Sequence, residues 1–192
     1  MDRNLISAFT GPFAVATMLA TLLAAAGCAS ATAGTTAAKP GASADGRANL
    51  IAYSIDSDGP YFSAVVTGAV GDYGPAVTVD PDGAVDPEHG SQLELKLVHG
   101  SFRLSISSLD DKLVQATAGE PVYPRTCSTF VDVTAGTPVV PGSGTGSYRD
   151  IAGSFTMTVT VDEVHAQPCT PAHLSFIRQV IMLSGPGTIS LG

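Results

Sequence analysis

The sequence has little charge, no tryptophan and few cysteines. Charged residues make up 14% of the 192 residues, tryptophan is absent, and the three cysteines are Cys28, Cys127 and Cys169. The chain has nine basic and 17 acidic residues, which gives a formal net charge of −8. This acidic balance disfavours binding to nucleic acid and electrostatic docking to anionic lipid.

Common catalytic and nucleotide-binding signatures are also missing. There is no G-x-S-x-G to place a hydrolase serine. The segment Gly142–Gly146 has the spacing G-x-G-x-G and lacks the Lys and Ser/Thr of a phosphate loop. The acidic segment "VDPDGAVDPEHG" fails the calcium-loop spacing, because counting from Asp80 puts Ala84 at the fifth position and Ser91 at the twelfth. We therefore predict no catalytic residue, no metal site and no cofactor, and favour a protein that is not an enzyme.

The first 27 residues have the order of an export signal. Arg3 is followed by the uncharged run "ISAFTGPFAVATMLATLLAAA" and then by Gly27 and Cys28. The end of this run, "AAGC", resembles a bacterial lipobox. The resemblance implies acylation of Cys28 (palmitate and related chains), cleavage after Gly27, and a lipid anchor at the outer face of the cell membrane. An ordinary signal peptide cut near Ala29 or Ala31, or an uncleaved membrane anchor, are the alternatives.

Lipidation of Cys28 would leave an even pair of cysteines in an oxidising compartment. We therefore predict a Cys127–Cys169 disulfide that closes a loop of about 40 residues. The alternative is two free thiols or a metal site, and only His165 and His173 lie near either cysteine.

The mature chain divides into a tether and one domain. Residues 28–48 are rich in Ala, Thr, Ser and Gly, and their composition predicts a flexible tether whose threonines could carry sugars. Residues 49–192 are enough for one domain with its own core.

The domain has the two-residue periodicity of β-strands. The clearest unit is the hairpin "SQLELKLVHGSFRLSIS", for which we predict a turn at His99-Gly100, Leu97 opposite Phe102, and Lys96 opposite Arg103. Only "SSLDDKLVQATAG" has a helical pattern, with Ser108 as its expected cap and Gly119 at its end. Further strands are expected at 50–56, 61–70, 75–79, 128–134, 154–164, 173–184 and 187–191. The number and spacing of the strands predict an antiparallel β-barrel of about eight strands.

Two turn segments carry the remaining polar candidates. "GDYG" places Asp72 and Tyr73 in a turn bounded by glycines, and His89 is the histidine that lies beside carboxylates. We consider Asp72, Tyr73 and His89 as candidate residues of a pocket mouth. "VDPDG" at Val79–Gly83 is a turn sequence in its own right, and His165 and His173 are expected at the surface.

Two resemblances extend these expectations. "GSGTGSYRDIAGSFTMTVTV" resembles the glycine-aromatic hairpin of dirigent and allene oxide cyclase-like barrels. The matching positions form the expected fold signature: Gly144, Gly146, Tyr148, Ile151, Gly153 and Phe155. More broadly, the mature domain is similar to exported proteins of mycobacteria and related actinobacteria that have no assigned activity.

Three functions follow as expectations. The first is a non-enzymatic barrel that binds a small apolar ligand or lipid in its lumen, as eight-stranded barrels can. The second is a structural or interaction protein of the envelope whose barrel is filled by side chains. The third, implied by the resemblance, is a cyclase-like or dirigent-like enzyme that shapes a reactive ligand.

Overall fold

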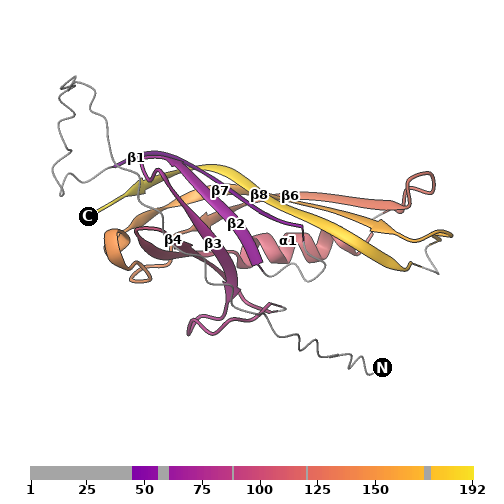
Figure 1. Cartoon of the computed structure of the whole chain (residues 1–192), viewed down its shortest axis with the longest axis horizontal. Coiled ribbons are helices and arrows are strands. Elements are labelled where there is room, and N and C mark those ends of the chain that lie inside the picture. Colours follow the sequence, from indigo (N-terminus) through magenta and orange to yellow (C-terminus); the bar gives the residue numbers. More distant parts are fainter. Residues whose placement is uncertain (1–44, 56–60, 88, 120, 171–173) are drawn as a thin grey trace, which may run out of the picture. The chain divides into compact units, whose positions relative to one another are not determined.

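The structure is a computed structural model that describes residues 45–55, 61–87, 89–119, 121–170 and 174–192. In these residues the chain forms eight strands, one α-helix and a short 3-10 helix, η1 (Figure 1). Their bounds are β1 Gly46–Ser54, β2 Tyr61–Gly68, β3 Asp72–Val79, β4 Gln92–Leu97, β5 Gly100–Ser105, α1 Ser107–Thr117, β6 Ser128–Pro138, η1 Gly146–Tyr148, β7 Ala152–His165 and β8 Phe176–Ser190.

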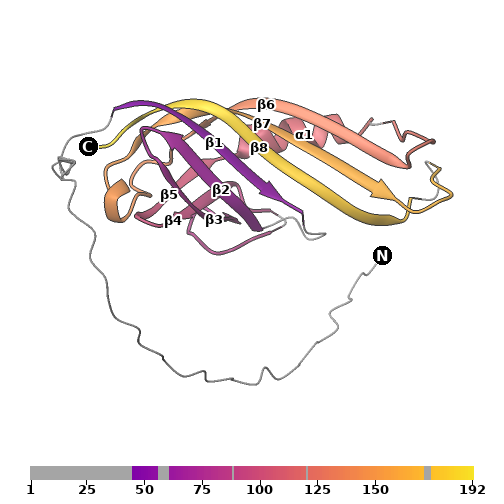
Figure 2. The same cartoon turned by 45° about the horizontal axis from the view of Figure 1, so that its top comes forward.

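The strands form one antiparallel sheet in the order β5-β4-β3-β2-β1-β8-β7-β6, which curls into a half-barrel (Figure 2). The predicted all-β fold with one short helix is confirmed. Burial alternates along most strands, as in β1, where Leu50 and Ala52 face inward and Ile51 and Tyr53 face outward. β1 begins at Gly46, so the fold starts three residues before the predicted boundary at Asn49.

The β5 edge of the half-barrel is bonded to the segment that follows β6. The backbone N–H of Val140 donates to the carbonyl of Arg103 (2.8 Å), and that of Thr145 donates to the carbonyl of Ser101 (2.8 Å). In return, the Arg103 N–H donates to the hydroxyl of Ser143 (3.0 Å). The segment therefore occupies an edge that would otherwise present unpaired backbone groups to another chain.

The β4–β5 hairpin forms, but its register is two residues away from the predicted one. The prediction set Lys96 opposite Arg103, whereas the structure sets Glu94 opposite Arg103 and Leu95 opposite Phe102. A shift of two residues keeps the same face buried, so the burial pattern could not distinguish the two registers. The observed register replaces a like-charge pair with an opposite-charge pair, which is the more stable arrangement.

The helix and two strands also differ in detail from the prediction. α1 starts at Ser107 after Ile106, and no side chain caps it, so the expected Ser108 cap is wrong. β8 runs unbroken where two strands were expected, because Pro186, flanked by Gly185 and Gly187, stays within the strand. Beside Pro186, the β7–β8 pairing is interrupted between Phe155 and Thr158. A proline has no N–H to donate, which accounts for the gap.

Side chains fill the interior of the half-barrel. The inward-facing residues of β1–β8 and α1 form one continuous buried cluster. Its central members are no more than 1% exposed, so almost no surface is left for even a water-sized probe; they include Leu50, Val66, Leu95, Phe102, Leu104, Phe155 and Met157. Within the described residues, the space enclosed by the sheet is therefore a packed core.

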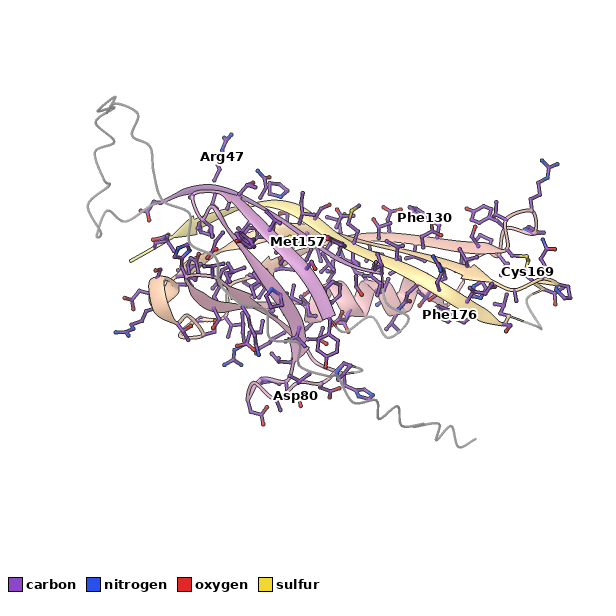
Figure 3. All side chains as sticks on the ribbon, in the orientation of Figure 1. Arg47, Asp80, Phe130, Met157, Cys169 and Phe176 are labelled. Atoms are coloured by element: carbon purple, nitrogen blue, oxygen red, sulfur yellow. A yellow bond between two sulfur atoms is a disulfide. The ribbon has the colours of Figure 1, made fainter. Side chains whose placement is uncertain are left out.

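The predicted disulfide is present. Cys127 and Cys169 are bonded, with Cα atoms 5.5 Å apart and a sequence separation of 42. The bond lies at the far end of β7 and β8 (Figure 3). It ties the segment before β6 to the segment after β7.

Removal of this disulfide should destabilise the domain without changing its fold. We expect the Cys127→Ser/Cys169→Ser double variant to lose about 3 kcal/mol of unfolding free energy, because the unfolded chain regains the entropy of a long loop. Urea unfolding of the double variant and of the unmodified protein, with and without reductant, measures this loss. Reductant should reproduce the loss in the unmodified protein and leave the double variant unchanged. Equal unfolding free energies of the two proteins in the absence of reductant would contradict the prediction.

Candidate functional site

A buried carboxylate lies where three separate segments meet. Asp72, the first residue of β3, has a side chain that is 1% exposed. Its Oδ2 accepts hydrogen bonds from the Tyr148 hydroxyl (2.6 Å) and the His99 backbone N–H (3.0 Å), and lies 3.1 Å from Nδ1 of the His99 ring. Its Oδ1 accepts from the Tyr73 N–H (2.8 Å). We call Asp72, His99 and Tyr148 the Asp72 clasp.

The electrostatics of the clasp favour an ionised carboxylate. Burial by itself raises the pKa of Asp72, but the hydrogen bonds from Tyr148, His99 and Tyr73 outweigh burial and lower the pKa to about 2. Burial, followed by the hydrogen bond to Asp72 and its negative charge, raises the pKa of the Tyr148 phenol. The pair is therefore a neutral phenol that donates to a charged carboxylate.

The local sequence brings these three residues together through two turns. The β4–β5 turn consists of Val98 and His99, one residue earlier than predicted, and Val98 N–H donates to the carbonyl of Tyr73 (3.1 Å). From the other side, Ser147 N–H donates to the carbonyl of His99 (2.9 Å). The ring of Tyr148 packs edge-on against Phe102, with centroids 5.4 Å apart.

The glycines of "GSGTGSY" permit this close approach. A Cβ atom on Gly144 would lie 1.7 Å from the Tyr148 carbonyl oxygen, and one on Gly146 would lie 2.4 Å from the His99 carbonyl oxygen. Gly100 faces the same segment, because its Cβ would lie 2.2 Å from the Thr145 carbonyl oxygen. The glycine motif therefore seats Tyr148 on Asp72 by backbone contact.

Within the clasp, Asp72 orients the imidazole ring of His99, but the described residues place no hydroxyl in a hydrogen bond with that ring. The His99 side chain is 65% exposed. The nearby hydroxyls of Ser101 and Thr145 lie 2.9 Å apart and hydrogen-bond to each other. A hydrolytic triad needs a hydroxyl on the second ring nitrogen of the histidine, and no such bond is found among the described residues. The bonds of the clasp instead fix the glycine loop to the hairpin.

The three candidate residues of the pocket mouth do not come together. Asp72 and Tyr73 open β3, but Asp72 points into the core whereas Tyr73 is 65% exposed on the outer face. His89 follows the opposite end of β3, and its ring lies 3.7 Å from Asp86 with the side chain 79% exposed. Glu88 and His173 lie outside the described residues, as do Gly27 and Cys28.

The acidic segment after β3 is a turn, as its sequence indicates. Gly83 N–H donates to the carbonyl of Asp80 (2.8 Å), and Gly83 has a φ of 91°. The Asp82 carboxylate accepts from the Ala84 N–H (3.1 Å). No group of three or more potential metal ligands occurs in the described part of the chain.

His165 is buried, so its expected surface position is wrong. It is 6% exposed and faces inward near the end of β7, where its backbone N–H donates to the carbonyl of Cys127 (2.7 Å). Nε2 of its ring lies 3.7 Å from the Glu163 carboxylate, beyond hydrogen-bonding distance. The inward parity of β7 and the neighbouring disulfide account for its burial.

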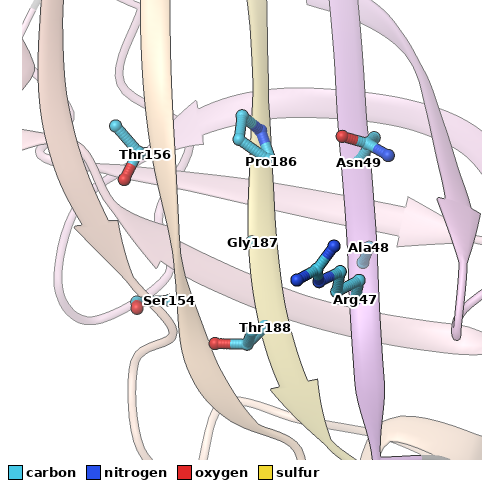
Figure 4. A pocket seen from close by; sticks show the side chains of 8 residues that line it. All are labelled: Arg47, Ala48, Asn49, Ser154, Thr156, Pro186, Gly187 and Thr188. Atoms are coloured by element: carbon cyan, nitrogen blue, oxygen red, sulfur yellow. The ribbon is translucent and has the colours of Figure 1, made fainter.

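A shallow polar hollow crosses the outer face at β7, β8 and β1 (Figure 4). Arg47 extends from β1 towards β8, and the other polar side chains around it are Asn49, Ser154, Thr156 and Thr188. The hollow is open to solvent and contains one cationic group, so it lacks the enclosure typical of a small-molecule site.

The remaining feature of the sheet is an uncovered apolar surface. Large apolar side chains on the outer side of β1, β2, β3 and β8 are exposed, and we call seven of them, each 42–65% exposed, the outer apolar face: Ile51, Tyr53, Tyr61, Val65, Tyr73, Val180 and Met182. They adjoin across strands, because Ile51 pairs with Val65, Val65 with Tyr73, and Tyr53 with Met182. Sequence reasoning missed this surface, although "NLIAYS" shows apolar residues at both parities of β1.

Comparison with family models, with curated proteins and with solved structures finds no match. Within the part of the chain that the structure describes, no helix is long and apolar enough to cross a bilayer.

Proposed function

We propose that this chain is an exported, lipid-anchored interaction protein of the bacterial envelope that binds another protein through its outer apolar face. The observation that carries the proposal is the outer apolar face itself. Soluble domains rarely leave a contiguous apolar surface of this kind uncovered unless it binds something. The packed interior supports the same function, because the inward residues serve as a core and leave the outer surface to make contacts.

The anchor is the second part of the proposal and concerns residues outside the described range. The apolar run, Gly27 and Cys28 have the order expected of a lipoprotein signal, and residues 28–48 have the composition expected of a tether. Such a tether would hold the domain at the outer face of the cell membrane, close to other envelope proteins.

Two other functions expected from the sequence need space inside the half-barrel. A lipid in the lumen or a cyclase-like reaction would require the buried cluster around Leu50, Phe102 and Met157 to open. Neither function has a feature among the described residues that favours it, and both stay predictions. A lipid that co-purifies from the native host and is found by native mass spectrometry would support the first.

In-cell photocrosslinking tests the proposal. A photoreactive residue in place of Val65, inside the outer apolar face, should yield a protein adduct in the membrane fraction. The same residue in place of Val114, which is 69% exposed on α1, should not. A Cys28→Ala variant carrying the Val65 probe should move out of the membrane fraction.

Absence of an adduct from Val65, Ile51 and Met182 alike would contradict the binding function. Retention of the Cys28→Ala variant on membranes would contradict the lipid anchor.

A further inference from the structure

We propose that the partner of the outer apolar face is a second copy of this chain, so that two anchored molecules pair through the outer sides of β1, β2, β3 and β8. This inference rests on the proposed function, because it names the partner for the same surface. The surface belongs to the middle of the sheet, since β2 and β1 are the central strands of the order β5-β4-β3-β2-β1-β8-β7-β6.

The area of the outer apolar face fits a dimer of ordinary size. Its seven residues are 42–65% exposed. At roughly 200 Å² for a fully exposed large side chain, they present about 700 Å² per copy. Two copies would bury about 1,400 Å², which lies within the range of specific protein interfaces, 1,200–2,000 Å². Because the sheet is curled, only part of each face can touch the other copy, so the buried area should lie towards the lower end of that range.

The composition of the face resembles the centre of a protein interface. It contains three tyrosines, a methionine and three aliphatic residues, and no charged residue. Interface centres are enriched in tyrosine and methionine and depleted in charge, and their rims are polar. Here Asp132 and Asp162 border the face on β6 and β7, and Arg47 borders it on β1.

The strand sequences also indicate a sheet that is covered on both sides. A strand with one wet face alternates apolar and polar residues, whereas a strand covered on both faces has apolar residues at both parities. In β1, Leu50 and Ala52 face the core while Ile51 and Tyr53 face outward. In β2, Val66 faces the core and Val65 faces outward. A second sheet packed on the outer side would complete this pattern as a sandwich.

A second copy fits better than a lipid surface. Protein surfaces that lie on membranes carry lysine and arginine around their apolar residues. This chain has a formal net charge of −8, and the face is bordered by two carboxylates, Asp132 and Asp162, against one cation, Arg47. In a two-fold dimer, each face packs against the identical face of the other copy. An uncharged face can do so without bringing like charges into contact. Tethering in one membrane would raise the effective concentration of the partner.

Two experiments on the full chain in its native membrane test the dimer. In the first, Ile51→Cys should give a disulfide-linked product of twice the protein's mass after mild oxidation, and Val114→Cys should not. In the second, two differently tagged copies should co-purify. Ile51→Asp should reduce co-purification about 30-fold, the change expected for a central interface residue, whereas Val114→Asp should leave it unchanged. The milder Ile51→Thr/Val65→Thr variant keeps β-forming residues in the strands and should reduce it in the same direction.

Three outcomes would overturn the dimer. A cross-link from Val65 to a different protein, with no product of twice the mass, would reject the second copy and leave the proposed function intact. Membrane retention of the Cys28→Ala chain that is lost on Ile51→Asp substitution, with no product of twice the mass from Ile51→Cys, would show that the face binds a membrane component other than a second copy. Undiminished co-purification of Ile51→Asp, with a folded domain by circular dichroism, would place the contact elsewhere.

Discussion

Replacement of Asp72 by alanine should cost about 4 kcal/mol of unfolding free energy. The substitution leaves the Tyr148 hydroxyl and the backbone N–H groups of His99 and Tyr73 without their acceptor. Each unsatisfied buried donor costs about 1–3 kcal/mol, and water reaching the exposed side of His99 recovers part of it. Chemical denaturation measures the loss. Asp132→Ala, which removes an exposed carboxylate from β6, should change stability by less than about 0.5 kcal/mol.

Two related variants separate the charge from the hydrogen bonds. Tyr148→Phe removes one donor and keeps the ring on Phe102, so it should cost about 1–2 kcal/mol. Asp72→Asn keeps an acceptor oxygen and loses the charge, and its cost should lie between those of Tyr148→Phe and Asp72→Ala. Hydrogen exchange should show faster opening of the β4–β5 turn and of the loop before η1 in all three variants. If Asp72→Ala matched Asp132→Ala, the clasp would have no role in stability.

The pH dependence of stability gives an independent readout of the same clasp. Because folding lowers the pKa of Asp72 from 3.8 to about 2, its contribution is fully present above about pH 4 and is lost as pH falls towards 2. Asp110 acts in the opposite direction: burial and then the charge of Asp111 raise its pKa to about 6, so stability rises as pH falls from 6 to 4. The Asp72→Asn variant has no carboxylate that titrates in the clasp, so its loss of stability below pH 4 should be smaller than that of the unmodified protein.

The strands and their buried faces were predictable because a strand's two-residue period is visible in the sequence. The register of the β4–β5 hairpin was not, since a shift of two residues buries the same leucines. The observed turn at Val98-His99 is bonded to Asp72 and Tyr73 on β3, a contact between residues that are far apart in the sequence. The disulfide was predictable for a different reason: three cysteines in a chain predicted to be exported leave one pair if Cys28 is lipidated.

The Asp72 clasp could not be found from the sequence. Asp72 and Tyr148 are 76 residues apart, and "GDYG" has the composition of an exposed turn. The glycine motif did indicate a constrained corner but not what the corner holds. The outer apolar face could have been predicted from the sequence, because apolar residues at both parities of β1 and β2 are typical of strands that are covered on both sides.

Replacement of Gly144 by alanine should prevent the loop before β7 from closing on the hairpin. The added Cβ would lie 1.7 Å from the Tyr148 carbonyl oxygen, a distance that no side-chain adjustment relieves, because the neighbour is backbone. The loop must move, and Tyr148 then leaves Asp72 and Phe102. We expect a loss of about 3 kcal/mol or more, the upper range for overpacking, measured by chemical denaturation and by accumulation of soluble protein.

Other glycines in the chain separate steric contact from backbone conformation. Gly136, on the outer side of β6, has no atom within 4 Å of an added Cβ, so Gly136→Ala should be nearly neutral. Gly142 also has open space but a φ of +71°, so Gly142→Ala should cost about 1–2 kcal/mol for the left-handed conformation alone. Gly146 combines a φ of +56° with a contact of 2.4 Å, and its alanine variant should be as damaging as Gly144→Ala. If Gly144→Ala were as stable as Gly136→Ala, the loop could move without loss, and the close packing of the motif would not hold Tyr148 on Asp72.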